Sequence, residues 1–233
     1  MSNRRAFTNA ELKSIALFSD VSKIDLDSIT ICENIKLSNE NFKYDEEIIK
    51  LWDSLETKPR VIVFDLDLTL WPFWVDSHVS PPFEKISIDH EGFTIVDKKR
   101  RKMTFYKDVP MILNTLKNYC LKGNGHMAIA SRTNEYKGAI ELIEHYGWKD
   151  YFMSFQMYSG SKAVHMEKIC EDIGGQINKN DILFFDDKKH NIDDTKCLGI
   201  TAYELDQRFG LTREDCLNGL KMHNCRLIES KRN

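Results

Sequence analysis

The stretch at residues 60–69 reads RVIVFDLDLT, and its two halves differ in chemistry. Positions 61–64 are apolar and mostly β-branched, which is typical of a strand buried on both faces of a parallel sheet. Asp65 and Asp67 follow at once, so two carboxylates lie at the carboxyl end of that strand. Ligands bind beyond the carboxyl ends of the strands in an open parallel sheet. This stretch therefore predicts both the fold and the place of the functional site.

The rest of the chain repeats this alternation. Short apolar runs recur at residues 127–130 and 182–185, and weaker ones occur at 152–155 and 200–203. Helical patterns accompany them at 109–122, 134–146, 162–173 and 188–198, each followed by a glycine that can end the helix. Strands that alternate with helices at this spacing predict an α/β fold, a Rossmann-like parallel sheet flanked by helices.

The segment from Leu66 to Asp108 is too long for a plain strand–helix connection. Residues 93–96 and 103–106 read as two strands joined by the basic stretch 97–102. We therefore predict a small β-hairpin cap over the carboxyl edge of the sheet, within an insertion at about 77–107.

The first 58 residues differ from the rest in composition. They contain no glycine and no proline, and they carry apolar residues at helical spacing at 12–18 and 48–55. We expect a helical N-terminal extension at 1–58 and a main domain at 59–233. The apolar stripes of the extension pack either on the main domain or on a partner protein, and the sequence leaves both open.

Charge and composition exclude several classes of protein. With 33 basic and 36 acidic residues the net charge is −3, so a broad nucleic-acid-binding surface is not expected, although the basic run 98–102 keeps this as a minor alternative. No apolar run approaches the roughly 18 residues that span a bilayer. The six cysteines form no Cys-x-x-Cys pair. We predict reduced cysteines, no membrane association, and a cytoplasmic or nuclear location.

Polar residues follow the predicted strands and begin one helix. They are Asp65, Asp67, Ser131, Arg132, Asp186 and Asp187, with Lys162 at a helix start. Four carboxylates at one edge repel one another, and a hard divalent cation such as Mg²⁺ relieves this. Basic and hydroxyl groups can bind phosphoryl oxygens, one carboxylate can attack phosphorus, and another can act as acid and base. The residues predict Mg²⁺-dependent phosphoryl transfer.

These residues resemble a known family. DLDLT at 65–69, then Ser131, Lys162 and Asp186-Asp187, follow the order of the four motifs of the haloacid dehalogenase superfamily. DLDLTLWPFWVD at 65–76, together with PPF, SRT, GSK, FFDD and Asn191 further on, is similar to the eukaryotic magnesium-dependent phosphatases. The resemblance covers about residues 60–220 and implies a haloacid dehalogenase-type sheet and a Mg²⁺-dependent acid phosphatase.

The resemblance also implies roles for the acidic residues. Asp65 would be the nucleophile and a metal ligand. Asp67 would be the general acid and base, with its main-chain carbonyl on the metal. Asp186 would bind the metal through its side chain, and Asp187 would act in the outer metal shell. The hydrolysis would pass through a phospho-aspartate.

The remaining site residues are assigned in the same way. Ser131 and Lys162 would hold phosphoryl oxygens, Arg132 would contact phosphate or substrate, and Asn191 would orient the metal-site carboxylates. The sequence departs from the family at Lys188-Lys189, where an acidic residue is common, and this could weaken the outer metal shell.

The substrate stays open at this point. The resemblance implies a phosphotyrosine protein, with phosphorylated sugars or fructosamines as the alternative. An interaction scaffold that uses residues 1–58 is the non-enzyme alternative. Of the aromatic residues Trp71, Phe73 and Trp74, we expect at least one at the substrate pocket, and we expect a structural role for His78.

Overall fold

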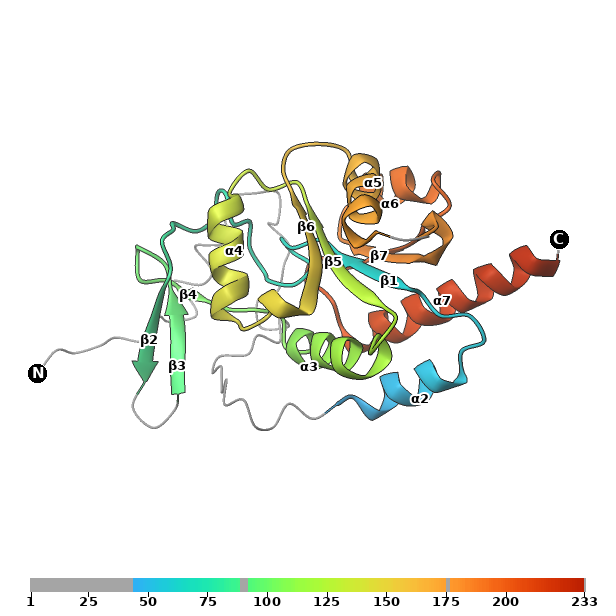
Figure 1. Cartoon of the computed structure of the whole chain (residues 1–233). Coiled ribbons are helices and arrows are strands. Elements are labelled where there is room, and N and C mark those ends of the chain that lie inside the picture. The colour runs from blue at the N-terminus through green and yellow to red at the C-terminus, as the bar shows by residue number, and fades with distance from the viewer. Residues whose placement is uncertain (1–43, 89–91, 175–176, 233) are drawn as a thin grey trace, which may run out of the picture.

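The computed structural model describes residues 44–88, 92–174 and 177–232 (Figure 1). The first of the two predicted N-terminal helices, near residues 8–18, lies outside these ranges. Within them, helices flank one parallel sheet, and a smaller sheet lies to one side of it.

Five strands of the described chain form the parallel sheet, in the order β6-β5-β1-β7-β8. Their bounds are Val61–Phe64 (β1), His126–Ser131 (β5), Phe152–Met157 (β6), Ile182–Asp186 (β7) and Thr201–Glu204 (β8). All five were predicted as apolar runs. The strand that carries the DLDLT stretch is central, so its carboxyl end lies between the ends of β5 and β7.

Helices cover both faces of this sheet. They are α3 (Val109–Thr115), continued by the π-helical turn η2 (Leu116–Cys120), α4 (Tyr136–His145), α5 (Lys162–Ile173), α6 (Lys189–Lys196) and α7 (Arg213–Arg232). Two short 3-10 turns, η3 (Lys149–Tyr151) and η4 (Lys179–Asp181), precede β6 and β7. Together with the sheet, they confirm the predicted fold class for the described residues.

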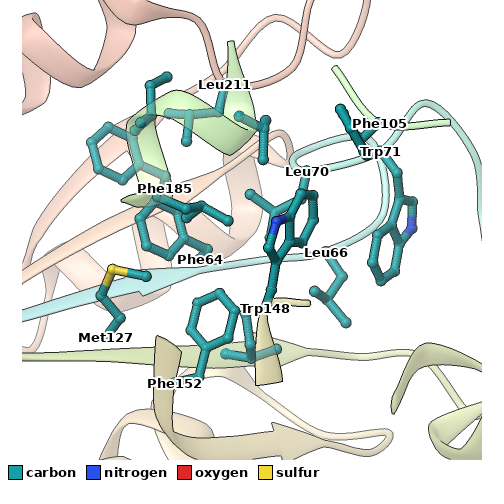
Figure 2. Close-up of a cluster of buried hydrophobic side chains, with 14 of the residues drawn as sticks. Phe64, Leu66, Leu70, Trp71, Phe105, Met127, Trp148, Phe152, Phe185 and Leu211 are labelled. Carbon is teal, nitrogen blue, oxygen red and sulfur yellow. The ribbon is translucent and has the colours of Figure 1, made fainter. Parts of the chain in front are cut away.

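The alternation along β1 decides which side chain packs on which face. Val61 and Val63 belong to a core cluster with residues of α5 and α6, whereas Ile62 and Phe64 belong to the cluster on the opposite face. Figure 2 shows part of the second cluster, in which Phe64 stacks on Phe185 at a centroid distance of 5.6 Å. Helix α7 approaches closely on this face, because a Cβ on Gly219 would lie 2.6 Å from the Phe185 ring.

The second predicted N-terminal helix is present as α2 (Glu46–Ser54). The Asp45 side chain caps it by accepting hydrogen bonds from the backbone amides of Glu47 and Ile48. Ile48 and Trp52 are buried in the main core, and α2 packs on α3 and α7. The apolar stripe of α2 therefore packs on the main domain rather than on a partner, while the division of domains at residue 58 stays a prediction.

The small sheet differs from the predicted hairpin. It has three antiparallel strands in the described chain, β2 (Glu84–Ile88), β3 (Gly92–Val96) and β4 (Lys102–Met103). Strand β2 was not predicted, because Glu84, Lys85 and Ser87 are exposed and leave little apolar alternation. Strand β4 is shorter than predicted. The side chain of Asp97 holds the intervening loop, accepting hydrogen bonds from the amides of Ser80, Lys99 and Arg101.

In the described residues, no helix is both long and apolar enough to cross a membrane.

Candidate active site

The site begins at a tight turn directly after β1. Leu68 adopts a left-handed conformation with φ 59°, which is uncommon for a residue other than glycine. Its amide donates to the carbonyl of Trp71, and the amides of Thr69 and Leu70 donate to the carbonyl of Leu66. This turn keeps Asp65 and Asp67 together at the carboxyl edge of the sheet.

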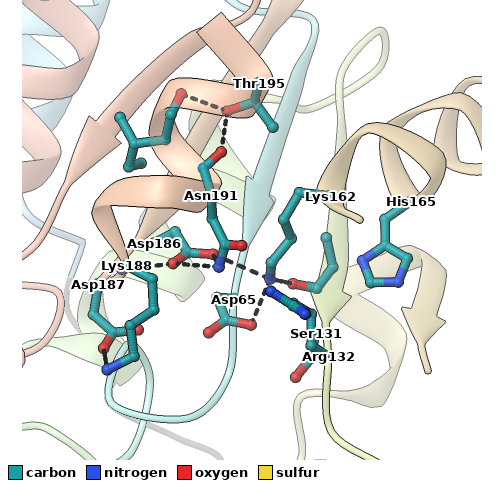
Figure 3. Close-up of polar contacts among 12 residues, drawn as sticks. Asp65, Ser131, Arg132, Lys162, His165, Asp186, Asp187, Lys188, Asn191 and Thr195 are labelled. Carbon is teal, nitrogen blue, oxygen red and sulfur yellow. Dashed lines mark hydrogen bonds and ion pairs between the residues drawn. The ribbon is translucent and has the colours of Figure 1, made fainter. Parts of the chain in front are cut away.

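Lys162 lies buried at the centre of the site, at the first position of α5 (Figure 3). Its Nζ donates to Oδ1 of Asp65 at 2.8 Å and to the carbonyl of Ala130, and it lies 3.1 Å from Oδ2 of Asp186. Burial alone would lower the pKa of this lysine, but the two carboxylates outweigh burial and raise it. Lys162 is therefore a permanent cation between the predicted nucleophile and the predicted metal ligand.

Asp65 has its second carboxylate oxygen free of described hydrogen-bond donors, as Figure 3 shows. Burial raises its pKa to about 7, Lys162 opposes this rise, and Asp186 and Asp187 add to it. A bound cation would favour the ionised carboxylate of Asp65.

Asp67 is held by the loop that follows it. Its Oδ1 accepts hydrogen bonds from Nε1 of Trp71 at 2.7 Å and from the amide of Val75 at 3.2 Å. Burial, followed by the charge of Asp65, raises the pKa of Asp67 well above its usual value. Asp67 is thus suited to carry a proton near neutral pH.

The acidic pair at the end of β7 completes the carboxylate group. Asp186 accepts hydrogen bonds at both oxygens from Nδ2 of Asn191, at 3.0 and 2.9 Å, and at Oδ1 from the amide of Lys188. One oxygen each of Asp65, Asp186 and Asp187 lie within 4.8 Å of one another. Burial raises the pKa of Asp187, and Lys188 pairs with it at 2.8 Å.

This donor set fits a divalent cation. Four carboxylates (Asp65, Asp67, Asp186 and Asp187) face two ammonium groups (Lys162 and Lys188), which leaves two formal negative charges in excess. Oxygen-only ligands favour Mg²⁺, which commonly binds through a few carboxylates and water. The side chain of Asp187 lies next to those of Asp65 and Asp186. The outer-shell role that the resemblance implies for Asp187 does not require so short a distance.

A cleft of about 310 Å³ opens above these residues. It is lined by Asp65, Asp67, Trp74, Asp76, Ser131, Arg132, Thr133, Lys162, Asp187, Lys188, His190 and Asn191. Every predicted site residue therefore lines this cleft or, in the case of Asp186, contacts residues that do. Ser131 and Lys162 are buried at its floor, while Arg132 is exposed at its rim.

Among the predicted aromatic candidates, Trp74 lines the cleft, whereas Trp71 and Phe73 stack on each other in the core. His78 has a structural contact, because its Nδ1 accepts a hydrogen bond from the amide of Trp74. Three further residues line the cleft that were not predicted as site residues, namely Asp76, Thr133 and His190. Their nearness to the motif residues in the sequence was the available signal.

A parallel sheet that carries Asp-x-Asp, Ser, Lys and Asp-Asp at its carboxyl edge defines a hydrolase of the haloacid dehalogenase type. The comparisons agree with this class. The model of the acid phosphatase family matches residues 57–226. Human magnesium-dependent phosphatase 1 is 40% identical over 153 residues, which cover 66% of this chain and 81% of that protein.

Two further matches are one curated protein and one solved structure. A HAD-like hydrolase superfamily protein of Schizosaccharomyces pombe is 32% identical over 174 residues, covering 71% of this chain and 94% of that protein. The crystal structure of a HAD-superfamily hydrolase from Ehrlichia chaffeensis aligns with a TM-score of 0.47 and 18% identity, covering 74% of this chain and 98% of that one. The chain belongs to the acid phosphatase family and is a magnesium-dependent phosphatase of the haloacid dehalogenase superfamily, which confirms the predicted resemblance and the predicted Mg²⁺.

Proposed function

We propose that the protein hydrolyses phosphate monoesters through a phospho-aspartate on Asp65. The observation that carries this proposal is the pairing of Asp65 and Asp67 at one cleft. Asp65 presents a carboxylate oxygen without a described hydrogen-bond donor, while Lys162 holds the other at 2.8 Å. Asp67, with its raised pKa, lies at the same cleft and can protonate a leaving group.

In the first step, an oxygen of Asp65 forms a bond to phosphorus as the bond from phosphorus to the leaving oxygen breaks. Asp67 gives its proton to that leaving oxygen. In the second step, Asp67 takes a proton from water, whose oxygen attacks phosphorus and breaks the bond to Asp65. The products are an alcohol or phenol and inorganic phosphate, and both carboxyl groups return to their initial states.

The floor of the cleft supports the phosphoryl group. The hydroxyl of Ser131 is buried there and can donate to a phosphoryl oxygen, while the buried ammonium of Lys162, which contacts Asp65, Asp186 and the carbonyl of Ala130, places positive charge beside it. Asp65, Asp186 and Asp187 would hold Mg²⁺, and Asn191 orients the carboxylate of Asp186. When bound, Mg²⁺ supplies positive charge that offsets the negative charge of the carboxylates and of the phosphoryl group.

For the substrate, phosphotyrosine in proteins is the leading candidate. Trp74 is half-buried in the wall of the cleft and offers a ring on which a phenyl group can pack. Phosphorylated sugars or fructosamines are the second candidate. The polar groups of Asp76, Thr133 and His190, which also line the cleft, favour it because they can bind sugar hydroxyls. The cytoplasmic or nuclear location stays a prediction.

The test is turnover of para-nitrophenyl phosphate by the purified protein with Mg²⁺ at mildly acidic pH. We expect wild-type activity, loss of activity on removal of the metal, and loss of at least roughly a thousandfold in kcat for Asp65→Asn, because the nucleophile is gone. Asp53→Asn, an exposed aspartate on α2, is the matched control and keeps wild-type turnover. Activity that survives in Asp65→Asn would overturn the mechanism.

A panel of phosphotyrosine peptides and sugar phosphates, compared by kcat/KM, separates the two substrate classes.

A further inference from the structure

Two side chains from opposite sides of β1 meet at the rim of the cleft. Arg132 follows the last residue of β5, and His190 lies in the first turn of α6, after β7. Both β5 and β7 pair with β1, so the two residues reach across the strand that carries Asp65. Nη1 of Arg132 lies 2.9 Å from Nε2 of His190, and both residues line the cleft.

The Arg132 contact leaves its positive charge without a counter-ion. A guanidinium only donates hydrogen bonds, so Nε2 of His190 is the acceptor in this contact and supplies no negative charge to Arg132. In the described part of the chain, no carboxylate forms an ion pair with Arg132. By contrast, Arg101, Arg208 and Arg213 each pair with an aspartate.

The other cations of the cleft already have partners. Lys162 lies between Asp65 and Asp186, and Lys188 pairs with Asp187 at 2.8 Å while lying 5.7 Å from the centroid of the Trp74 ring. Among the described cleft residues, Arg132 is therefore the lysine or arginine whose charge no carboxylate neutralises. The cleft offers this charge to an anion that comes with the substrate.

The charge of Arg132 lies nearer to the protein surface than the place where the phosphoryl group would bind. Ser131 and Lys162, the predicted phosphoryl donors, are buried at the floor with 2% and 1% of their surface exposed. Arg132 and His190 are both exposed at the rim. A phosphoryl group bound next to Asp65 would occupy the floor, so the rim pair faces the part of the substrate beyond the scissile oxygen.

We propose that Arg132 and His190 form a rim subsite that binds a second anionic group, a carboxylate or a phosphate, on the same phosphate monoester. The guanidinium supplies charge and paired N–H donors, and His190 positions the guanidinium and adds a ring N–H. This inference rests on the proposed function and narrows its substrate class to esters that carry a further negative charge.

The test compares matched substrates. A series of carboxyalkyl phosphates of increasing chain length is assayed against the corresponding uncharged carboxamides, and the readout is the acid-to-amide ratio of kcat/KM. We expect wild type to prefer the acid by roughly tenfold at the best length, as one charge-assisted contact at an exposed rim would give. Arg132→Gln and His190→Ala should each move this ratio towards one, and the double variant should go no further, because both residues serve one subsite.

Lys189→Ala is the matched control. It removes a positive charge beside His190, but Lys189 pairs with Asp193 and does not line the cleft, so the ratio should stay at the wild-type value.

A second arm uses phosphotyrosine peptides with glutamate or glutamine next to the phosphotyrosine. A preference confined to one arm identifies the source of the anion, a small metabolite or an acidic peptide.

A wild-type ratio of one or less throughout both arms would overturn the inference, as would variants that lower the rates for acid and amide equally, since that result would place Arg132 on the phosphoryl group. Hydrolysis of the amides tests the proposed function separately. If no ester is hydrolysed, binding of carboxyalkyl phosphonates and their amides by calorimetry replaces turnover, and equal affinities would contradict the subsite.

Discussion

Lys162 is the residue around which the carboxylates of the site are arranged. Its ammonium contacts Asp65, Asp186 and the carbonyl of Ala130, so one buried cation fixes the ends of β1, β5 and β7 relative to one another. A buried ion pair is costly to desolvate and rarely adds net stability. This ion pair serves to position the side chains, because it holds the proposed nucleophile Asp65 and the proposed metal ligand Asp186 close together.

Binding of Mg²⁺ is expected to release a proton from Asp65. Burial raises the pKa of Asp65 to about 7 in the metal-free protein, and a bound cation favours the carboxylate. As pH falls through 7, protons occupy Asp65 and compete with the metal, so the affinity should be roughly tenfold weaker at pH 6 than at pH 8. Calorimetry in buffers of different ionisation enthalpy measures the released proton. No proton release at pH 6.5 would contradict the assignment.

Asn191→Ala is expected to weaken Mg²⁺ binding by tenfold or more. Asn191 donates to both oxygens of Asp186, and groups that orient metal ligands typically contribute this much to affinity. The measurement is the Mg²⁺ dissociation constant by calorimetry, together with the Mg²⁺ dependence of Tm. Asn118→Ala, at an exposed asparagine that does not line the cleft, is the control and should bind Mg²⁺ as wild type does.

At the scale of elements, each strand of the central three delivers one part of the chemistry. Asp65, the proposed nucleophile, directly follows β1, β5 ends at the proposed phosphoryl donor Ser131, and β7 ends at Asp186. The amino end of α5 adds Lys162. Because parallel strands end at one edge, four segments far apart in the chain contribute to one cleft.

Helix α2 is expected to contribute to the stability of the phosphatase domain. Ile48 is fully buried in the main core, so Ile48→Ala should lower the free energy of unfolding by about 2–5 kcal/mol. Chemical denaturation measures this change. Lys50→Ala, on the exposed face of the same helix, should change stability by less than about 0.5 kcal/mol. Equal stability of Ile48→Ala and wild type would show that α2 is not part of the folded core.

At the scale of the whole molecule, the two faces of the sheet are closed by different helices, and their packing buries two histidines. His165 on α5 and His223 on α7 are both fully buried, and burial lowers the pKa of each to about 4. Nδ1 of His223 contacts the hydroxyl of Thr201 at 2.9 Å, while Nε2 has no hydrogen-bond partner among the described residues. The fold therefore tolerates His223 only as a neutral group.

His223 is expected to make the folded state sensitive to acid. The unfolded chain protonates a histidine near pH 6.5, whereas the folded protein keeps His223 neutral down to about pH 4. Between these values the unfolded state binds more protons, so the free energy of unfolding falls as pH falls, by up to about 3 kcal/mol from this residue. In His223→Asn this part of the decrease should vanish.

The measurement for His223 is the difference in unfolding free energy between pH 7 and pH 4.5, compared between wild type and His223→Asn. Comparing differences matters, because the raised pKa values of Asp65, Asp67 and Asp187 act in the opposite direction in both proteins. Ser230→Ala, at an exposed and non-ionisable residue of α7, is the control and should keep the wild-type difference. Identical pH dependence in wild type and His223→Asn would contradict the prediction.

Much of the fold could be predicted because its signals are local. An apolar β-branched run predicts a buried strand wherever it occurs, and a glycine after a helical pattern predicts the end of a helix, as Gly174 does with φ 68° after α5. Strand β2 could not be predicted in this way. Its sequence EKISI is exposed on most positions, so it carries little of the apolar alternation that reveals a strand.

The sequence by itself determined which residues follow each strand, and therefore that Asp65, Ser131 and Asp186 share one edge. It did so because strands that alternate with helices along the chain are parallel, and parallel strands end at one edge of the sheet. Only the tertiary structure decided that an oxygen of Asp187 lies within 4.8 Å of oxygens of Asp65 and Asp186, that α2 lies in the core, and that Arg132 meets His190. Such contacts join positions that are distant in the chain, such as Lys162 and Asp65 at a separation of 97 residues. They depend on the order of the strands in the sheet and on side-chain packing, which no local pattern encodes.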